Sequence, residues 1–96
     1  MITHVVLFKL KDSSPESIYK AEQVLRSLEG RVPVIRSIEV GVDVLRSQRS
    51  YDICLTVKFD TLEDLEAYQS HPEHVLVADY IGSVRESVAV VDYEGR

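Results

Sequence analysis

The segment "AYQSHPEHV", residues 67–75, holds most of the side chains in this chain that could carry out acid–base chemistry. It contains Tyr68, His71 and His74, and thus two of the three histidines among 96 residues. An imidazole exchanges a proton near neutral pH, and a phenol can donate a hydrogen bond to a developing oxyanion. The segment is therefore either a helix junction that uses histidine or one wall of a reaction site.

Pro72 separates the two histidines. Proline does not continue a helix comfortably, but it suits the first turn of a new one. We therefore expect one helix over "DTLEDLEAYQS" and another that begins at Pro72 and runs through "HPEHVLVADYIGSVRE". His71 then belongs to the junction or to the rim of a site, whereas His74 points inward on the second helix together with Ala78.

The third histidine, His4, lies in the alternating run "ITHVVLFKLK". One face of this predicted strand, which includes Phe8, is apolar apart from His4. Helical spacing places Tyr68 on the same face of its helix as Leu62 and Leu65. The spacing therefore predicts that His4, Tyr68 and His74 meet between a sheet and its helices.

Three inward polar rings allow two interpretations. They could satisfy one another as a polar plug in a small core, because buried polar groups need hydrogen-bond partners. Alternatively they mark a small-molecule site, which is usually an apolar pocket with a few convergent polar groups. The positive end of the helix dipole and burial both disfavour a protonated His74, and a neutral histidine can act as a general base.

In that second interpretation Tyr68 hydrogen-bonds a substrate carbonyl or enolate oxygen, and His4 orients His74 or the substrate. His74, Tyr68 and His4 are therefore the predicted catalytic residues. The side chains predicted to contact a ligand, with His71 at the rim, are His71, Phe8, Leu25, Val40, Ile53, Leu55 and Ala78.

The remaining patterns predict the elements that position these groups. The segment "SSPES", residues 13–17, signals a helix start, either with Ser14 as cap before Pro15 or with Ser13 and Glu16 as a capping box. Gly30 is the expected stop of that helix. Asp60 with Glu63, or Thr61 with Asp64, is expected to cap the helix over "DTLEDLEAYQS". The candidate capping pairs are thus Ser13–Glu16, Asp60–Glu63 and Thr61–Asp64.

Two further runs, "SIEVGVDVL" and "YDICLTVKF", alternate strictly and are joined by a short polar loop, which predicts an antiparallel pair. "SVAVVDY" predicts a last strand. The order of strand, helix, two strands, helix pair and strand is typical of a split βαβ, ferredoxin-like α+β sandwich with helices on one face. We expect one domain over residues 1–96.

The other face of the predicted sheet carries Val5, Leu7, Cys54, Thr56 and part of the last strand. This surface is too apolar in its middle to remain in water. We therefore predict a homodimer in which a second copy packs against the open sheet face.

Composition excludes several classes of partner. The net charge is −5 and the 11 Lys and Arg are scattered, so we expect no nucleic acid. No apolar run is long enough for a membrane span, and the N-terminus lacks a signal-peptide pattern, which favours the cytoplasm. Cys54 has no disulfide partner. His71 and His74 with Glu73 or Asp79 form only a weak metal pattern, so neither a metal nor a cofactor is predicted.

The motifs "HVVLFKLK", "YDICLTVKFDTLEDLEAYQSHPEHV" and "VVDY" resemble the stress-responsive dimeric A/B barrel family over nearly the whole chain. The resemblance implies a ferredoxin-like protomer whose sheet packs face to face with that of a partner. Function in that family is diverse. Some plant members are stress-induced, and one closes a linear polyketide by an aldol condensation through the tyrosine and last histidine that correspond to Tyr68 and His74, with His4 in the same cavity.

The resemblance leaves the function open between two main hypotheses. One is a non-catalytic dimer that binds a small carbonyl-type or apolar ligand, with a stress-related role. The other is a cyclase-like enzyme that uses His74 as base. Metal-dependent or oxygenase chemistry is a third alternative without a motif of its own. The first helix carries Ala21, Leu25 and Leu28 where the cyclising relative has aromatic residues, which implies a pocket of different shape.

Overall fold

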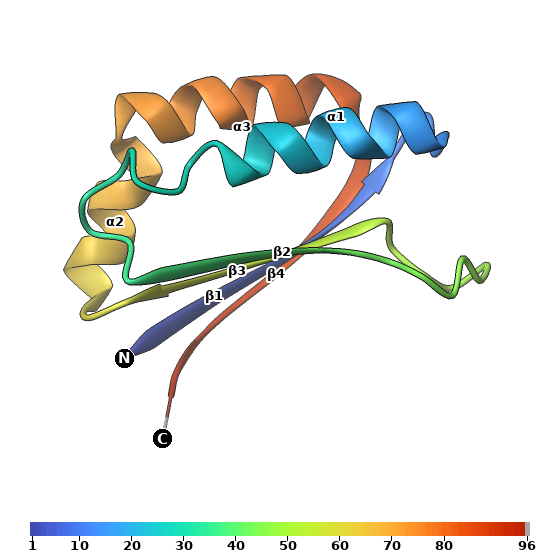
Figure 1. The fold of residues 1–96 in the computed structure, drawn as a ribbon. Helices are drawn as coiled ribbons and strands as arrows, with labels where there is room; N and C mark the ends of the chain where they lie inside the picture. The colour runs from blue at the N-terminus through green and yellow to red at the C-terminus, as the bar shows by residue number, and fades with distance from the viewer. Residues whose placement is uncertain (96) are drawn as a thin grey trace.

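The computed structural model describes residues 1–95 and shows one antiparallel sheet of four strands with three helices on one face (Figure 1). The strands are β1 (Ile2–Leu10), β2 (Ser37–Val42), β3 (Ile53–Phe59) and β4 (Arg85–Glu94), in the order β2-β3-β1-β4. The helices are α1 (Pro15–Arg26), α2 (Leu62–Ser70) and α3 (Pro72–Val84). The ferredoxin-like α+β prediction is confirmed.

Local hydrogen bonds explain where each helix begins. The Ser14 side chain accepts from the Ser17 amide and Pro15 takes the first position of α1, so the first of the two predicted caps is the one formed. Thr61 accepts from the Asp64 amide at the start of α2. These bonds satisfy amides that have no partner within the helix.

Four local expectations were wrong. α1 ends at Arg26 rather than at Gly30, which lies in the following turn with φ 79°. β2 ends at Val42, so Val44 does not continue the strand and is 95% exposed on the projecting β2–β3 loop. Leu62 starts α2 on its solvent side. α3 stops at Val84, because Arg85 and the next residues already pair with β1.

The inner face of the sheet packs under the helices, as the alternation predicts. Val6 and Phe8 of β1 and Leu55 and Val57 of β3 are buried there. Leu25 of α1 is among the helix side chains that cover them. Burying such side chains stabilises the fold by about 1.5–3 kcal/mol each.

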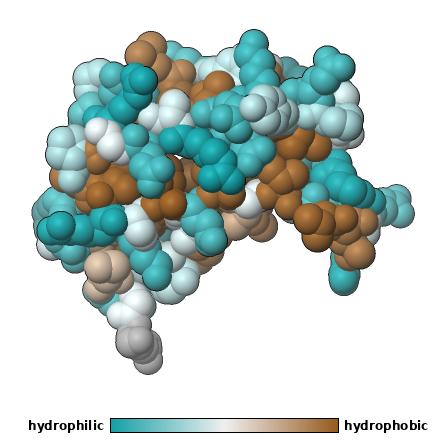
Figure 2. Space-filling view, viewed as in Figure 1, coloured by the Kyte–Doolittle hydropathy of each residue, from teal (hydrophilic) through white to brown (hydrophobic). Residues whose placement is uncertain are grey.

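Within residues 1–95, the outer face of the sheet carries no helix (Figure 1). Val5, Leu7, Cys54 and Thr56 are half-buried on it, and the β4 side chain of Val91 is exposed. The β2–β3 loop extends beyond the layers and shows an apolar patch at its tip, formed by Val44 and Leu45 (Figure 2).

Asp52 fixes the base of that loop. It is a carboxylate that is only 3% exposed, just before β3. The amide of Leu10 donates to it at 2.8 Å, and the Arg46 guanidinium donates at 2.8 Å from the loop. A buried charge needs such partners, and these two join the loop to β1.

Candidate functional site

A cavity of about 260 Å³ lies between the inner face of the sheet and the helices. Its walls come from β1, β3, β4 and all three helices, and most of the lining side chains are apolar. The polar members are His4, Tyr68, Gln69, His74 and Arg85. Several of the lining residues, among them Ala78, Gly82 and Arg85, are exposed, so the cavity is open to solvent. Its volume suits a small ligand, because pockets for drug-sized molecules start at about 300 Å³.

Tyr68 forms the inner wall from the last turn of α2 and is 1% exposed. Its ring packs against Phe59 at a centroid distance of 5.1 Å. Burial raises the pKa of Tyr68 to about 12, so the phenol stays protonated at neutral pH. Among residues 1–95 no group hydrogen-bonds the hydroxyl, and no fully enclosed side-chain polar atom lacks a partner. The hydroxyl is therefore a donor that faces the cavity and has no acceptor among residues 1–95.

His74 lies beside Tyr68, with ring centroids 4.3 Å apart. It occupies the third position of α3, two residues after Pro72. Nδ1 donates to the carbonyl oxygen of Gln69 at 3.0 Å, which leaves Nε2 as the nitrogen without a proton in the neutral ring. Burial lowers the pKa of His74, and the nearby His4 lowers it further, while the Gln69 carbonyl opposes them. His74 is thus held neutral with a basic Nε2.

His4 completes the group from β1, with its ring centroid 5.9 Å from that of Tyr68. Its Nδ1 donates to a carboxylate oxygen of Asp92, directly opposite on β4. This bond fixes the ring orientation and the tautomer of His4. Sequence reasoning missed Asp92, although the last strand was predicted; the antiparallel register of β1 and β4 is the signal that identifies the pair.

The structure places the predicted ligand contacts in two groups. Phe8, Leu25, Leu55 and Ala78 line the cavity together with the three rings; whether they touch a ligand stays a prediction. The cavity wall does not include Val40 and Ile53, which are packed in the core nearer the β2–β3 loop, or His71.

His71 has a structural role at the junction. It ends α2 and caps α3, because its Nδ1 accepts from the amide of Glu73 at 3.1 Å. Of the two histidines that are close in sequence, His71 therefore caps a helix, whereas His74 lines the cavity. Within residues 1–95, no three or more His, Cys, Asp or Glu side chains are grouped so that they could hold a metal ion.

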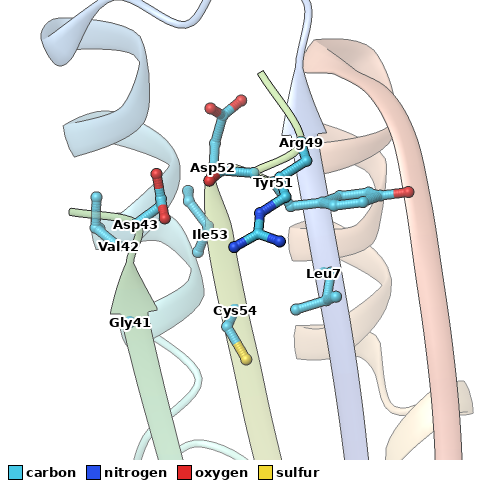
Figure 3. A pocket seen from close by; sticks show the side chains of 10 residues that line it. Leu7, Gly41, Val42, Asp43, Arg49, Tyr51, Asp52, Ile53 and Cys54 are labelled. Atoms are coloured by element: carbon cyan, nitrogen blue, oxygen red, sulfur yellow. The ribbon is translucent and has the colours of Figure 1, made fainter. Parts of the chain in front are cut away.

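A second cavity, of about 430 Å³, lies on the outer face of the sheet next to the β2–β3 loop. Figure 3 shows Arg49 and Tyr51 extending from the loop over the end of this face, where they line the cavity with Leu7 and Cys54. This cavity is larger, but it is an indentation in the uncovered face and holds none of the three rings. We therefore take the inner cavity as the candidate site.

The fold and this cavity define the protein as a ferredoxin-like α+β sandwich with a small inner site and an uncovered sheet. Residues 2–95 match the model of the stress responsive A/B barrel domain, and the chain belongs to this family. In the part of the chain that the structure describes, no helix has the length and apolar character to cross a bilayer.

Three relatives illustrate the range of the family. Olivetolic acid cyclase from Cannabis sativa is 26% identical over 99% of this chain and 97% of its own length. The stress-response A/B barrel domain-containing protein DABB1 from Arabidopsis thaliana is 28% identical, and the chain spans 46% of that protein. A dimeric protein of unknown function from Bacteroides fragilis is 35% identical over 98% of this chain and 95% of its own, with a TM-score of 0.83.

Proposed function

We propose that this protein binds a small carbonyl compound in the inner cavity and removes a proton from the carbon next to the carbonyl. The observation that carries this proposal is the pairing of a basic His74 Nε2 with an unengaged Tyr68 hydroxyl in the wall of one cavity. A base and an oxyanion donor are the two groups that enolate formation requires. The similarity to a cyclase over almost the whole chain supports the same chemistry.

In the proposed step the carbon–hydrogen bond breaks and its proton moves to Nε2 of His74. The electron pair forms the new carbon–carbon double bond, and the carbonyl π electrons move onto oxygen. The Tyr68 hydroxyl donates a hydrogen bond to that oxygen, and the low polarity around it strengthens this bond. The resulting enolate either regains a proton or attacks a second carbonyl.

His4 is assigned a supporting role. The bond to Asp92 holds its ring next to Tyr68, where we expect it to face the oxygen of a bound carbonyl group. Because the ring is already fixed in place, it does not have to reorient when negative charge develops on the carbonyl oxygen. Preorganised polar groups lower the barrier of a reaction in this way.

The matching test is deuterium exchange into aliphatic methyl ketones in D₂O, followed by proton NMR. The exchange rate of the wild-type protein should exceed that of His74→Asn by about 100-fold or more, because general bases contribute about 10²–10⁴-fold. His71→Asn is the control, since asparagine also caps helices well and this residue lies outside the cavity wall.

The outcome separates the two functions that this cavity could serve. Ketone binding without exchange in the wild-type protein would show a non-catalytic binding module whose rings only pack on one another. Equal exchange by the wild-type protein and His74→Asn would remove His74 as the base. The family name suggests stressed cells as the source in which to search for the natural ligand.

We also propose that two copies of the chain associate through the outer face of the sheet. The half-buried apolar side chains there have no cover within residues 1–95. The Bacteroides fragilis relative is dimeric. A sheet packed against a second sheet would bury this face at a spacing of about 10 Å.

A further inference from the structure

The inner cavity is polar at both ends and apolar between them. His4, Tyr68 and His74 form one end, and Arg85 lines the other, where α3 gives way to β4. Of the residues within 1–95 that line the cavity, Arg85 alone carries a permanent charge. The proposed chemistry at the histidine end does not use this charge.

An irregularity in the sheet directs Arg85 to this face. Val88 pairs with Phe8 and Ser87 pairs with Lys9, but Leu10 pairs with Arg85, so that Glu86 is an extra residue. In a regular strand Arg85 would share the outer face with Ser87. The bulge at Glu86 resets the alternation and turns Arg85 to the side of the inner cavity, and such bulges often re-aim side chains next to functional sites.

The guanidinium of Arg85 is also available for a ligand. Within residues 1–95, the arginines that form ion pairs with carboxylates are Arg26, Arg31, Arg36 and Arg46. Arg85 is not among them. An arginine fork matches a carboxylate in a two-point hydrogen-bonded geometry.

We propose that Arg85 binds the carboxylate of an elongated oxo acid whose carbonyl group lies in the cavity against the Tyr68 hydroxyl and Nε2 of His74. This assignment rests on the proposed function and names its substrate class. The backbones of His74 and Arg85 are separated by about 16 Å at a helix rise of about 1.5 Å per residue. The ligand must therefore span the apolar middle of the cavity with an aliphatic segment, next to Val88 and Val90.

The test compares 7-oxooctanoate with its primary amide, which has the same length and lacks the charge. Dissociation constants are measured by calorimetry for the wild-type protein, Arg85→Gln and Arg85→Lys. The control variant is Arg31→Gln, which removes the same charge from an exposed residue outside the cavity wall.

The wild-type protein should bind the acid about tenfold more tightly than the amide, as expected for hydrogen bonds to a charged group. Arg85→Gln should abolish this preference, so that the acid and the amide bind with equal affinity. Arg85→Lys should keep part of the preference, and Arg31→Gln should keep all of it. Equal affinity of the wild-type protein for the two compounds would overturn the proposal, and so would a preference that survives in Arg85→Gln.

These experiments can reject the carboxylate site and the proton abstraction independently of each other. A preference for the acid that depends on Arg85, without deuterium exchange into the ketone, supports the carboxylate site and rejects the proposed proton abstraction. Exchange into uncharged ketones with no preference for the acid keeps the chemistry and rejects the carboxylate site. Absence of binding by both compounds at millimolar concentration rejects the carboxylate site, and the exchange experiment with methyl ketones then decides on the proton abstraction alone.

Discussion

The two faces of the sheet have similar apolar residues but opposite surroundings. The inner face is covered by helices, and a cavity lined by three polar rings lies between this face and the helices. The outer face, with Val5 and Leu7 at its centre, is covered by nothing within residues 1–95. Since both faces come from the same alternating strands, the difference in their surroundings underlies our proposal that one face binds a ligand and the other associates with a second copy.

The largest expected effect is on the outer face. Leu7→Asp would place a carboxylate in an apolar interface twice, once from each copy, and each unpaired buried charge costs several kcal/mol. We expect the dimer dissociation constant, measured by analytical ultracentrifugation, to rise on the order of 1,000-fold. Leu62→Asp, at an exposed leucine of α2 away from this face, is the control and should remain dimeric. A Leu7→Asp dimer of unchanged affinity would place the interface elsewhere.

The next effect is on the inner face. Tyr68→Phe removes a hydroxyl that has no acceptor among residues 1–95 and keeps the ring that packs on Phe59. We expect ketone exchange to fall about 100-fold, as when one oxyanion donor is removed, with the free energy of unfolding little changed. Exchange kinetics and urea titration measure the two quantities. A large loss of stability with normal exchange would instead show that the tyrosine is a structural plug.

A smaller effect distinguishes the two histidines of the helix junction. His71→Ala removes the acceptor for the Glu73 amide and should lower the free energy of unfolding by about 0.5–2 kcal/mol. His71→Asn should restore most of this loss, because asparagine is a favourable cap. Urea titration of the three proteins provides the measurement. If His71→Ala and His71→Asn lose the same stability, the ring acts by packing rather than by capping.

The smallest effect concerns pH. Burial lowers the pKa of His74 below its ordinary value of 6.5, so the unfolded chain takes up this proton first as the pH falls. The stability that depends on a neutral His74 is therefore present above pH 6.5 and is lost as the pH drops through that value towards the lower pKa of the folded state. Urea midpoints across this range should fall less in His74→Gln than in the wild-type protein. Parallel curves would contradict a lowered pKa.

Alternation and cap residues predicted most of the fold. The polar outer positions of α1, the proline at each of two helix starts and the alternating strands all follow local rules. The failures lie where local rules compete. Gly30 is a typical helix stop, but Ser27 already ends α1. Val44 continues an alternating pattern, but the chain has left the sheet.

The site was predictable only in part, for the same reason. Helical spacing brought Tyr68 and His74 together, because both lie on short, regular elements. Asp92 and Arg85 depend on the pairing of β1 with β4, which joins the two ends of the chain. No local pattern gives that register, and the extra residue Glu86 reverses the face that simple alternation assigns to Arg85.

The direct junction of α3 with β4 has a mechanical consequence. No residue separates Val84 from Arg85, and the amide of Lys11 holds the Val84 carbonyl at 2.9 Å. We therefore expect a shift of α3 on ligand binding to be passed to the start of β4, whose alternate side chains lie on both faces of the sheet. We then expect ligand binding and the association of two copies to be coupled, so that a ligand strengthens or weakens association by the same factor by which association changes the affinity for the ligand.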